Sequence, residues 1–399
     1  MTRTHLPRKQ LTTYKRAFGA LLALAAVAGV TAGARPDDAR ARPETVPRAT
    51  TDHPRLRALL HRLSTTDGSP GVLVAVRDRT GRAVLTSGVA DVRRHTPLRA
   101  DSRFRIGSMT KPFVATVVLQ LAGEGRVVLD APVERYLPGV VRGHGNDGRK
   151  VTVRQLLQHT SGLPDYLDDL KPQDIIEHPL THYDTRDLIR LALTHRPDFE
   201  PGAQVRYSNT GYLLAGLLIE RVTGHTYADE IRRRVIAPLH LRRTSLPGDA
   251  TGIRGPHPRG YVRTGKGEPL KDLTALNPSF AGPSGDMISN GADMNRFLDA
   301  LVRGRLLRPA QLRQMMKTRP TGSPDGGAYG LGLESHPLPC GGLAWGYDGG
   351  VPGYQTIGAV TVDGRQATAM ANLYPGEAQA QDDDMRAVIP TALCAADDG

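Results

Sequence analysis

Hydrophobic residues at helical spacing open the regular part of the chain. One face of the first expected helix carries four leucines: Leu56, Leu59, Leu60 and Leu63. Two β-rich runs follow at 71–79 and 83–91, joined by a turn at Arg79-Thr80-Gly81. The pattern therefore predicts a helix followed by a hairpin.

The middle of the chain changes to a helical period between residue 108 and about residue 241. Gly and Pro separate five expected helices, at 111–123, 153–159, 185–195, 210–222 and 227–239. Two more helices are expected beyond a loop region, at 292–302 and 309–317.

Strand-like runs return toward the C-terminus, at 329–334, 343–347, 354–362 and 366–373, and a final helix is expected from about 377 to 394. Strands at both ends of a helical insert imply one sheet that distant parts of the chain complete, with helices on its faces. We therefore predict an α/β fold with a mostly α inserted subdomain.

The N-terminus has a different composition from the rest. Five basic residues precede an apolar run at 17–34, which ends in the small-x-small sequence Ala32-Gly33-Ala34. We interpret 1–34 as a removed export signal, 35–52 as a flexible Pro- and Arg-rich tether, and 53–399 as one folded domain. A single-pass anchor is the alternative, since the run is about long enough to span a bilayer.

The formal net charge of +12 falls to +7 without the first 34 residues, which hold five basic residues and no acidic one. The remaining excess is spread along the chain, and this favours adhesion to an anionic surface such as a cell wall over nucleic-acid binding. We expect a secreted protein, extracellular or associated with the cell wall.

Cys340 and Cys394 are the two cysteines of the sequence. In an exported protein such a pair predicts a disulfide, which would tie the final helix to a strand near the site; two buried thiols are the alternative. Closing a loop of 54 residues stabilises the fold by about 4 kcal/mol in the chain-entropy model.

Candidate chemistry begins at Ser108-Met109-Thr110-Lys111, where a helix is expected to start. Residues three apart on a helix are neighbours, so the Lys111 amine could reach the Ser108 hydroxyl. A second signal is Tyr207-Ser208-Asn209, in an exposed turn before an apolar helix. Tyr207 would carry protons there, and Asn209 would hold Lys111 and a substrate.

Together with their neighbours, these motifs resemble the serine β-lactamase and penicillin-binding-protein superfamily, in the branch of class C β-lactamases and secreted D-alanyl-D-alanine carboxypeptidases. The resemblance covers roughly 53–394. It rests on Phe104-Arg105-Ile106-Gly107-Ser108-Met109-Thr110-Lys111, the stretch 129–139, His159-Thr160-Ser161-Gly162-Leu163, Pro201-Gly202, Tyr207-Ser208-Asn209, Tyr347-Asp348-Gly349-Gly350 and Gly353-Tyr354.

The resemblance implies an antiparallel sheet and an acyl-enzyme mechanism without metal or cofactor. Ser108 would be the nucleophile, and the backbone N–H groups of Ser108 and Gly350 would hold the oxyanion. Lys111 and Tyr207 would share the proton transfers. A base at neutral pH needs its pKa lowered from about 10 toward 7; burial does this for a lysine but has the opposite effect on a tyrosine, and the division of roles stays open.

The third motif departs from the family pattern of Lys or His, then Thr or Ser, then Gly. This chain has Tyr347-Asp348-Gly349, and Glu334 stands where close carboxypeptidase relatives carry an arginine. Two acids would repel a substrate carboxylate unless basic residues such as Arg254 or Arg263 compensate. His159 is expected to be a buried, hydrogen-bonded histidine of a structural turn.

The resemblance implies a D-alanyl-D-alanine carboxypeptidase first, acting on peptidoglycan stem peptides, with β-lactams as acylating ligands. The third motif favours esters, amides or peptides with a neutral or amine-bearing end, so an esterase, amidase or aminopeptidase is the alternative. A penicillin-binding ectodomain that does not turn over is an alternative of another class.

Overall fold

The computed structural model describes residues 53–78, 81–265, 267–376 and 379–394. The predicted export signal and tether, 1–34 and 35–52, lie outside the described residues. Among the described residues, no helix has both the length and the apolar character needed to cross a membrane.

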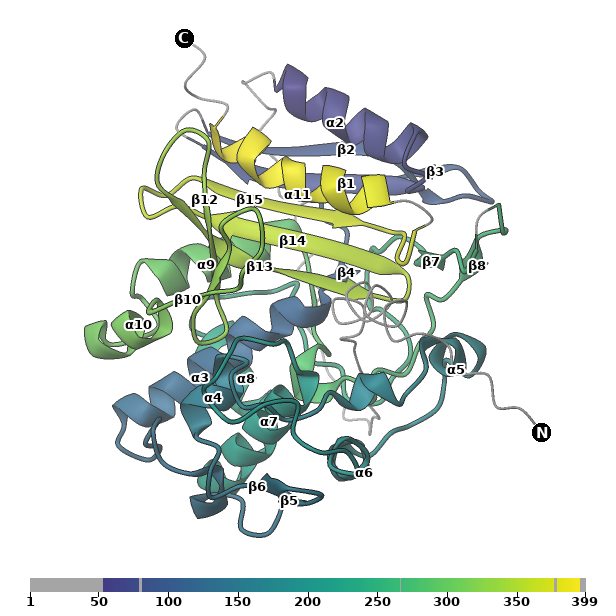
Figure 1. The fold of residues 1–399 in the computed structure, drawn as a ribbon. Helices are drawn as coiled ribbons and strands as arrows, with labels where there is room; N and C mark the ends of the chain where they lie inside the picture. Colours follow the sequence, from purple (N-terminus) through teal and green to yellow (C-terminus); the bar gives the residue numbers. More distant parts are fainter. Residues whose placement is uncertain (1–52, 79–80, 266, 377–378, 395–399) are drawn as a thin grey trace, which may run out of the picture.

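A nine-stranded antiparallel sheet forms the centre of the molecule (Figure 1). Its strands, in spatial order, are β10 (Arg319–Pro320), β11 (Ala328–Tyr329), β12 (Glu334–Pro337), β13 (Leu343–Val351), β14 (Tyr354–Val360), β15 (Gln366–Ala371), β1 (Gly71–Arg77), β2 (Arg82–Asp91) and β3 (Thr96–Pro97). Because β1 pairs with β15, the N- and C-terminal segments complete one sheet, which confirms the predicted fold class.

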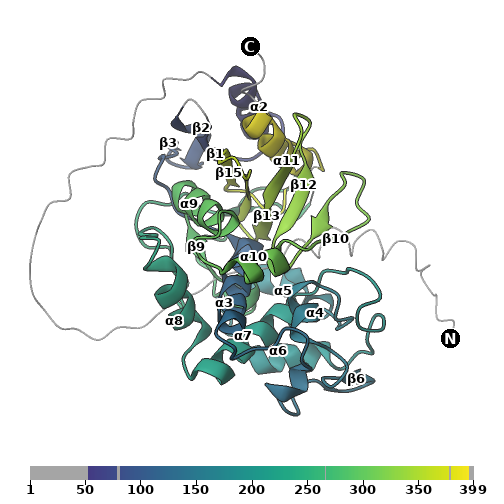
Figure 2. The same ribbon diagram turned by 90° about the vertical axis from the view of Figure 1, so that its left-hand side faces the viewer.

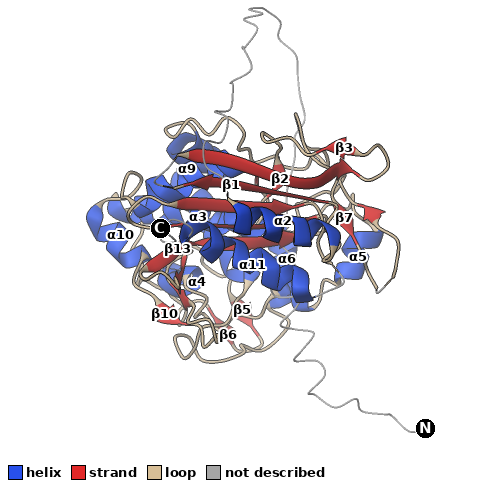
Figure 3. Cartoon of the chain, turned by 90° about the horizontal axis from the view of Figure 1, so that it is seen from above, coloured by secondary structure: helices blue, strands red, loops and turns tan. Residues whose placement is uncertain are grey.

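Two helices from opposite ends of the chain cover one face of this sheet. They are α2 (Pro54–Thr65) and α11 (Gln379–Cys394), which lie side by side in Figures 1 and 3. The four leucines of α2 are buried against apolar residues of β1, β15 and α11. The predicted leucine face therefore packs on the sheet.

The opposite face carries the helical part of the chain (Figure 2). Its helices are α3 (Lys111–Gly123), α4 (Val153–Leu157), α5 (Pro172–Glu177), α6 (Thr185–Ala192), α7 (Asn209–Thr223), α8 (Tyr227–Ile231), α9 (Gly291–Val302) and α10 (Pro309–Met315). α9 contacts β1, β14 and β15 directly, while α3 and α7 pack against each other below it. One large apolar cluster joins these helices to the sheet.

Short elements complete the described chain. The 3₁₀ helices are η1 (Gly107–Thr110), η2 (Val133–Arg135), η3 (Tyr166–Asp168) and η5 (Gly282–Ser284), and η4 (Arg232–Ile236) is a π-helical turn. Three two-stranded pairs join β4 (Phe104–Arg105) to β9 (Ile288–Ser289), β5 (Arg142–Gly143) to β6 (Asn146–Asp147), and β7 (Tyr261–Val262) to β8 (Lys271–Asp272).

Two expected elements are wrong in detail. The single strand expected at 329–334 is a hairpin, because Gly332 has a φ of +75° and the chain turns between β11 and β12. The helix expected at 227–239 changes to a π-helical turn after Ile231. This turn brings Arg233 and Arg234 onto the buried carboxylate of Glu230.

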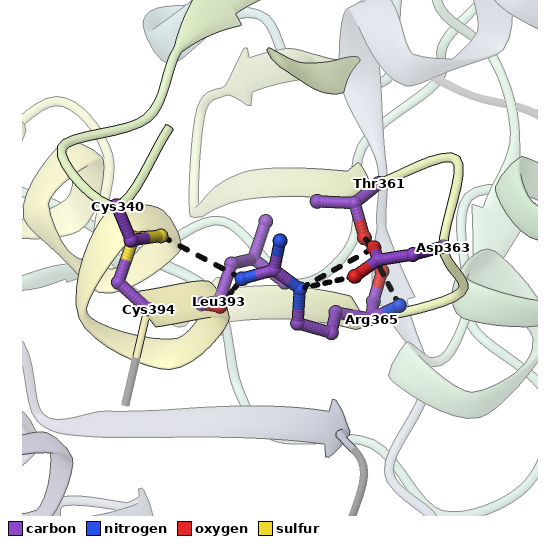
Figure 4. The surroundings of a disulfide bond; sticks show 6 residues. All are labelled: Cys340, Thr361, Asp363, Arg365, Leu393 and Cys394. Carbon is purple, nitrogen blue, oxygen red and sulfur yellow. Dashed lines mark hydrogen bonds and ion pairs between the residues drawn. A yellow bond between two sulfur atoms is a disulfide. The ribbon is translucent and has the colours of Figure 1, made fainter. Parts of the chain in front are cut away.

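A disulfide joins Cys340 to Cys394, the last residue of α11 (Figure 4). Cys340 lies in the turn between β12 and β13, so the bridge ends in a turn and not in the expected strand. Arg365 donates to the Leu393 carbonyl oxygen and to Cys340 Sγ, 3.6 Å away. The end of α11 is thereby attached to the sheet.

Candidate active site

The site begins where η1 meets the C-terminal end of β13. Gly107 opens η1 with a φ of +53°, and a Cβ at this position would lie 3.0 Å from Gly350 N. A Cβ at Gly349 would lie 2.9 Å from Ser108 N. Glycine is therefore required on both segments, and their close approach places Ser108 against the strand.

Lys111 is fully buried one turn after Ser108, at the start of α3. Its Nζ lies 3.0 Å from Ser108 Oγ, 2.8 Å from Asn209 Oδ1 and 2.7 Å from the Ser284 carbonyl oxygen. The last two atoms can only accept hydrogen bonds. A neutral amine with two hydrogens would donate to both and would turn its lone pair toward Ser108.

Burial sets the charge state of Lys111. Desolvation lowers the pKa of its amine to about 7, and the carboxylates of Asp165, Asp348 and Glu334 act in the opposite direction. At neutral pH a large fraction of Lys111 is therefore a free amine, which can accept a proton.

Tyr207 lies on the other side of the Ser108 hydroxyl. Its Oη is 2.5 Å from Ser108 Oγ and 3.3 Å from Asn209 Oδ1. Burial raises the pKa of Tyr207 well above 10, so its phenol keeps its proton at neutral pH. The hydroxyl can donate and accept at once, as a proton carrier does.

Tyr347, the first residue of the third motif, belongs to a separate hydrogen-bonded group. His159 Nδ1 accepts from the Ser208 N–H, and burial lowers the pKa of His159 well below 6.5. The neutral ring therefore has its proton on Nε2, which faces Tyr347 Oη at 3.4 Å. Tyr347 in turn hydrogen-bonds Tyr329. The position that carries a cation in the family pattern is here a neutral phenol.

Asp348 and Glu334, which we name the third-motif acids, lie on β13 and β12. Burial and the Glu334 charge raise the pKa of Asp348, while Arg386 and His336 lower it. His336 Nε2 is 3.3 Å from Glu334 Oε2. Asp382 also interacts with Arg386 through its charge. The carboxylates of Asp348, Glu334 and Asp382 therefore outnumber the basic side chains beside them, Arg386 and His336.

The edge of β13 is open beside Ser108. β12 pairs with β13 only through residues 343–346, and no described strand pairs with residues 347–351 on that side. The backbone amides of Ser108 and Gly350 meet at this open segment. A substrate carbonyl could lie there between two N–H donors.

The structure thus brings four predicted residues into one hydrogen-bonded group: Ser108, Lys111, Tyr207 and Asn209. Gly349 and Gly350 lie against this group. Tyr347 hydrogen-bonds His159 and Tyr329 instead, and the disulfide of Cys340 and Cys394 lies at the end of α11. Sequence reasoning missed Asp165, Ser284 and Arg386. Only Asp165 had a signal, as it closely follows His159-Thr160-Ser161-Gly162-Leu163.

Comparison with known families identifies the family of most of the chain. The family model described as Beta-lactamase matches residues 56–389. The chain belongs to this beta-lactamase family. It has the fold of serine β-lactamases and penicillin-binding proteins.

Relatives with known structures include amide-hydrolysing enzymes. A D-stereospecific amidohydrolase from a Streptomyces species is 39% identical, with a TM-score of 0.79 over 86% of this chain and 99% of its own. The D-amino acid amidase of Ochrobactrum anthropi SV3 is 29% identical, with a TM-score of 0.71 over 84% of this chain and 97% of its own.

Penicillin-binding protein 4* of Bacillus subtilis represents a second group of relatives. It is 28% identical over 70% of this chain. The match spans 62% of the Bacillus protein, so the chain covers about three fifths of the length of this relative.

Proposed function

We propose that the protein is a serine amidase that hydrolyses amides of D-amino acids, with Ser108 as the nucleophile. The observation that carries this proposal is a contrast within the site. The hydrogen-bonded group of Ser108, Lys111, Tyr207 and Asn209 is complete, while the third motif is acidic. The negative charge of the third-motif acids acts on Lys111, and it favours a substrate with a protonated amine and no carboxylate, because like charges held close together cost several kcal/mol. An amino-acid amide has this charge pattern.

Two relatives support the choice of substrate. The amidohydrolase that is 39% identical is described as D-stereospecific, and the Ochrobactrum enzyme is a D-amino acid amidase. The preference for the D-configuration is proposed from these two proteins.

In acylation, we assign the base to Lys111. The Ser108 proton passes to the Lys111 lone pair while Oγ attacks the amide carbon, and the N–H groups of Ser108 and Gly350 bind the developing oxyanion. Lys111, with Tyr207 as carrier, then returns a proton to the amide nitrogen. The C–N bond breaks, and ammonia leaves.

Deacylation reverses these transfers with water as the nucleophile. Water attacks the acyl carbon and gives up a proton to the same pair of residues, and Ser108 Oγ recovers a proton as the ester bond breaks. The D-amino acid leaves, and the starting protonation state returns.

A direct test measures hydrolysis of D-phenylalanine amide, L-phenylalanine amide and a D-alanyl-D-alanine peptide by one preparation. We expect kcat/KM to be highest for the D-amide. Faster turnover of the D-alanyl-D-alanine peptide would support the carboxypeptidase that the sequence implied first. A single acylation without turnover of any substrate would support a penicillin-binding ectodomain.

We also propose that the protein acts outside the cytoplasm. The disulfide supports this, since such bonds persist in oxidising compartments. N-terminal sequencing of protein recovered from the culture medium tests it; a mature chain that starts at Arg35 is expected, and an intact chain found only inside cells would contradict it.

A further inference from the structure

Asp165 lies behind the catalytic group, at the N-terminus of η3. Its Oδ2 accepts hydrogen bonds from Asn209 N at 3.1 Å and from Asn209 Nδ2 at 2.9 Å. Its Oδ1 accepts from Leu167 N at 3.2 Å. Both carboxylate oxygens are therefore engaged, and two of the three bonds go to Asn209.

These bonds decide which way the Asn209 amide faces. An asparagine side chain ends in one acceptor and one donor group. Because Asp165 holds Nδ2, Oδ1 is the atom that lies 2.8 Å from Lys111 Nζ. A flipped amide would place its oxygen against the Asp165 carboxylate and its NH₂ against the Lys111 amine.

The direction of this amide matters for the Lys111 lone pair. With Asn209 Oδ1 and the Ser284 carbonyl as fixed acceptors, the free amine turns its lone pair to Ser108. A flipped Asn209 would donate to that lone pair and compete with the Ser108 hydroxyl for it.

We propose that Asp165 is a positioning residue that locks the Asn209 amide so that Lys111 can take the proton of Ser108. The inference rests on the proposed role of Lys111 as the base. Asp165 also adds a negative charge close to Lys111, and this second effect can be separated from the first.

Several ionisable groups face Lys111. They are Asp165 before η3, His159 after α4, Tyr207 and Tyr212 around the start of α7, Glu334 on β12 and Asp348 on β13. Asp165 is the carboxylate that raises the pKa of Lys111 most. Loss of its charge would lower the pKa of Lys111, so the free amine would persist to lower pH.

Two substitutions separate position from charge. Asp165→Asn keeps an oxygen that can accept both Asn209 bonds but removes the charge. Asp165→Ala removes both the oxygen and the charge. Asp168→Asn is the matched control, since Asp168 is in the same turn, is 35% exposed and lies 3.9 Å from Arg206.

The experiment measures the rate at which a fluorophosphonate labels Ser108 across pH 5 to 9. Ser108 Oγ forms a bond to phosphorus, fluoride leaves, and the serine proton passes to the base, so the rate reports activation of the nucleophile without a natural substrate. Hydrolysis of D-phenylalanine amide is measured in parallel, and unfolding midpoints show the folded fraction.

We expect Asp165→Asn to keep the maximal labelling rate within about threefold of the wild type. The fall of this rate toward low pH should move to lower pH. Asp165→Ala should lower the maximal labelling rate at least about tenfold, and it should have no further effect in an Asn209→Ala background. Asp168→Asn should behave as the wild type.

The inference would be overturned if Asp165→Ala had the labelling rate and pH dependence of the wild type. It would also be overturned if Asp165→Ala lowered the labelling rate by the same factor in the Asn209→Ala background. So would a lower unfolding midpoint with unchanged labelling per folded molecule. Labelling of the wild type without amide hydrolysis would reject the proposed substrate and leave this test intact. If the wild type reacts neither with the fluorophosphonate nor with D-phenylalanine amide, both proposals are rejected.

Discussion

The two sides of the candidate active site differ in how closely they keep the family pattern. On the side of η1 and α7, each polar atom of Ser108, Lys111 and Tyr207 has a partner suited to proton transfer. On the side of β12 and β13, a phenol and the third-motif acids replace the expected cationic and hydroxyl groups. We therefore infer that different parts of the site carry the reaction and the choice of substrate.

This separation has a physical basis. Bond making at the carbonyl needs groups within hydrogen-bond reach and backbone donors from two fixed segments, and these tolerate little change. Recognition of the leaving group depends on the charge around its binding position, which a few side chains can reverse.

The largest effect should come from removing the nucleophile. Ser108→Ala should lower kcat/KM for D-phenylalanine amide by at least about 10⁴-fold, because no other hydroxyl occupies its position between Lys111 and Tyr207. Ammonia release gives the rate, and intact mass after a β-lactam gives the control. An adduct on the variant would show a second nucleophile.

Replacing the base should have a smaller but large effect. Lys111→Arg replaces the amine by a guanidinium that cannot lose its proton, so a loss of about 10² to 10⁴-fold is expected. In the wild type, kcat/KM should rise as pH increases through about 7, since Lys111 accepts a proton only as the free amine. A flat profile from pH 5 to 9 would contradict this role.

Changing the third-motif acids should alter selectivity and leave acylation intact. Glu334→Arg should raise the preference for a leaving group with a carboxylate over its amide by about tenfold, or about 1.4 kcal/mol. The rate of fluorophosphonate labelling should change little. Glu268→Arg, an equal charge change on an exposed loop residue, is the control and should leave the ratio unchanged.

The smallest effect on catalysis is expected at the disulfide. Changing Cys340 and Cys394 to serine together should lower the free energy of unfolding by about 2 to 4 kcal/mol. Amide hydrolysis by the folded protein should be unchanged, since the bridge holds α11 and not the catalytic group. Denaturant unfolding with matched rate measurements checks both statements. A tenfold loss of activity would show that α11 affects the catalytic residues.

Much of the fold followed from hydrophobic spacing. The leucine face of α2 and the division of the sheet between both ends of the chain agree with the structure. The hairpin at β11 and β12 did not follow, because a glycine in an apolar run fits either a strand or a turn. The π-helical turn after α8 also lacked a local signal.

The site shows the same limit. Motif spacing identified Ser108, Lys111 and Tyr207 as candidates, since each is a chemically distinctive residue in a short pattern. The Ser284 carbonyl is a backbone group, and Arg386 on the last helix acts on the third-motif acids through its charge, so only the folded chain shows them. The role of Tyr347 could not be predicted from the sequence either, because it depends on hydrogen bonds to His159 and Tyr329 that only the fold brings together.

The most direct test of the contrast between the two sides is the ratio of kcat/KM for two substrates with the same acyl group. Cleavage of the peptide bond releases D-phenylalanine from both D-phenylalanyl-D-alanine and its C-terminal amide, and only the charge of the leaving group differs. The rate measured is the release of D-phenylalanine, so that hydrolysis of the terminal amide is not counted. We predict that the wild type favours the amide by at least about tenfold, because the third-motif acids repel the carboxylate. Equal rates, or a preference for the free carboxylate, would contradict the account.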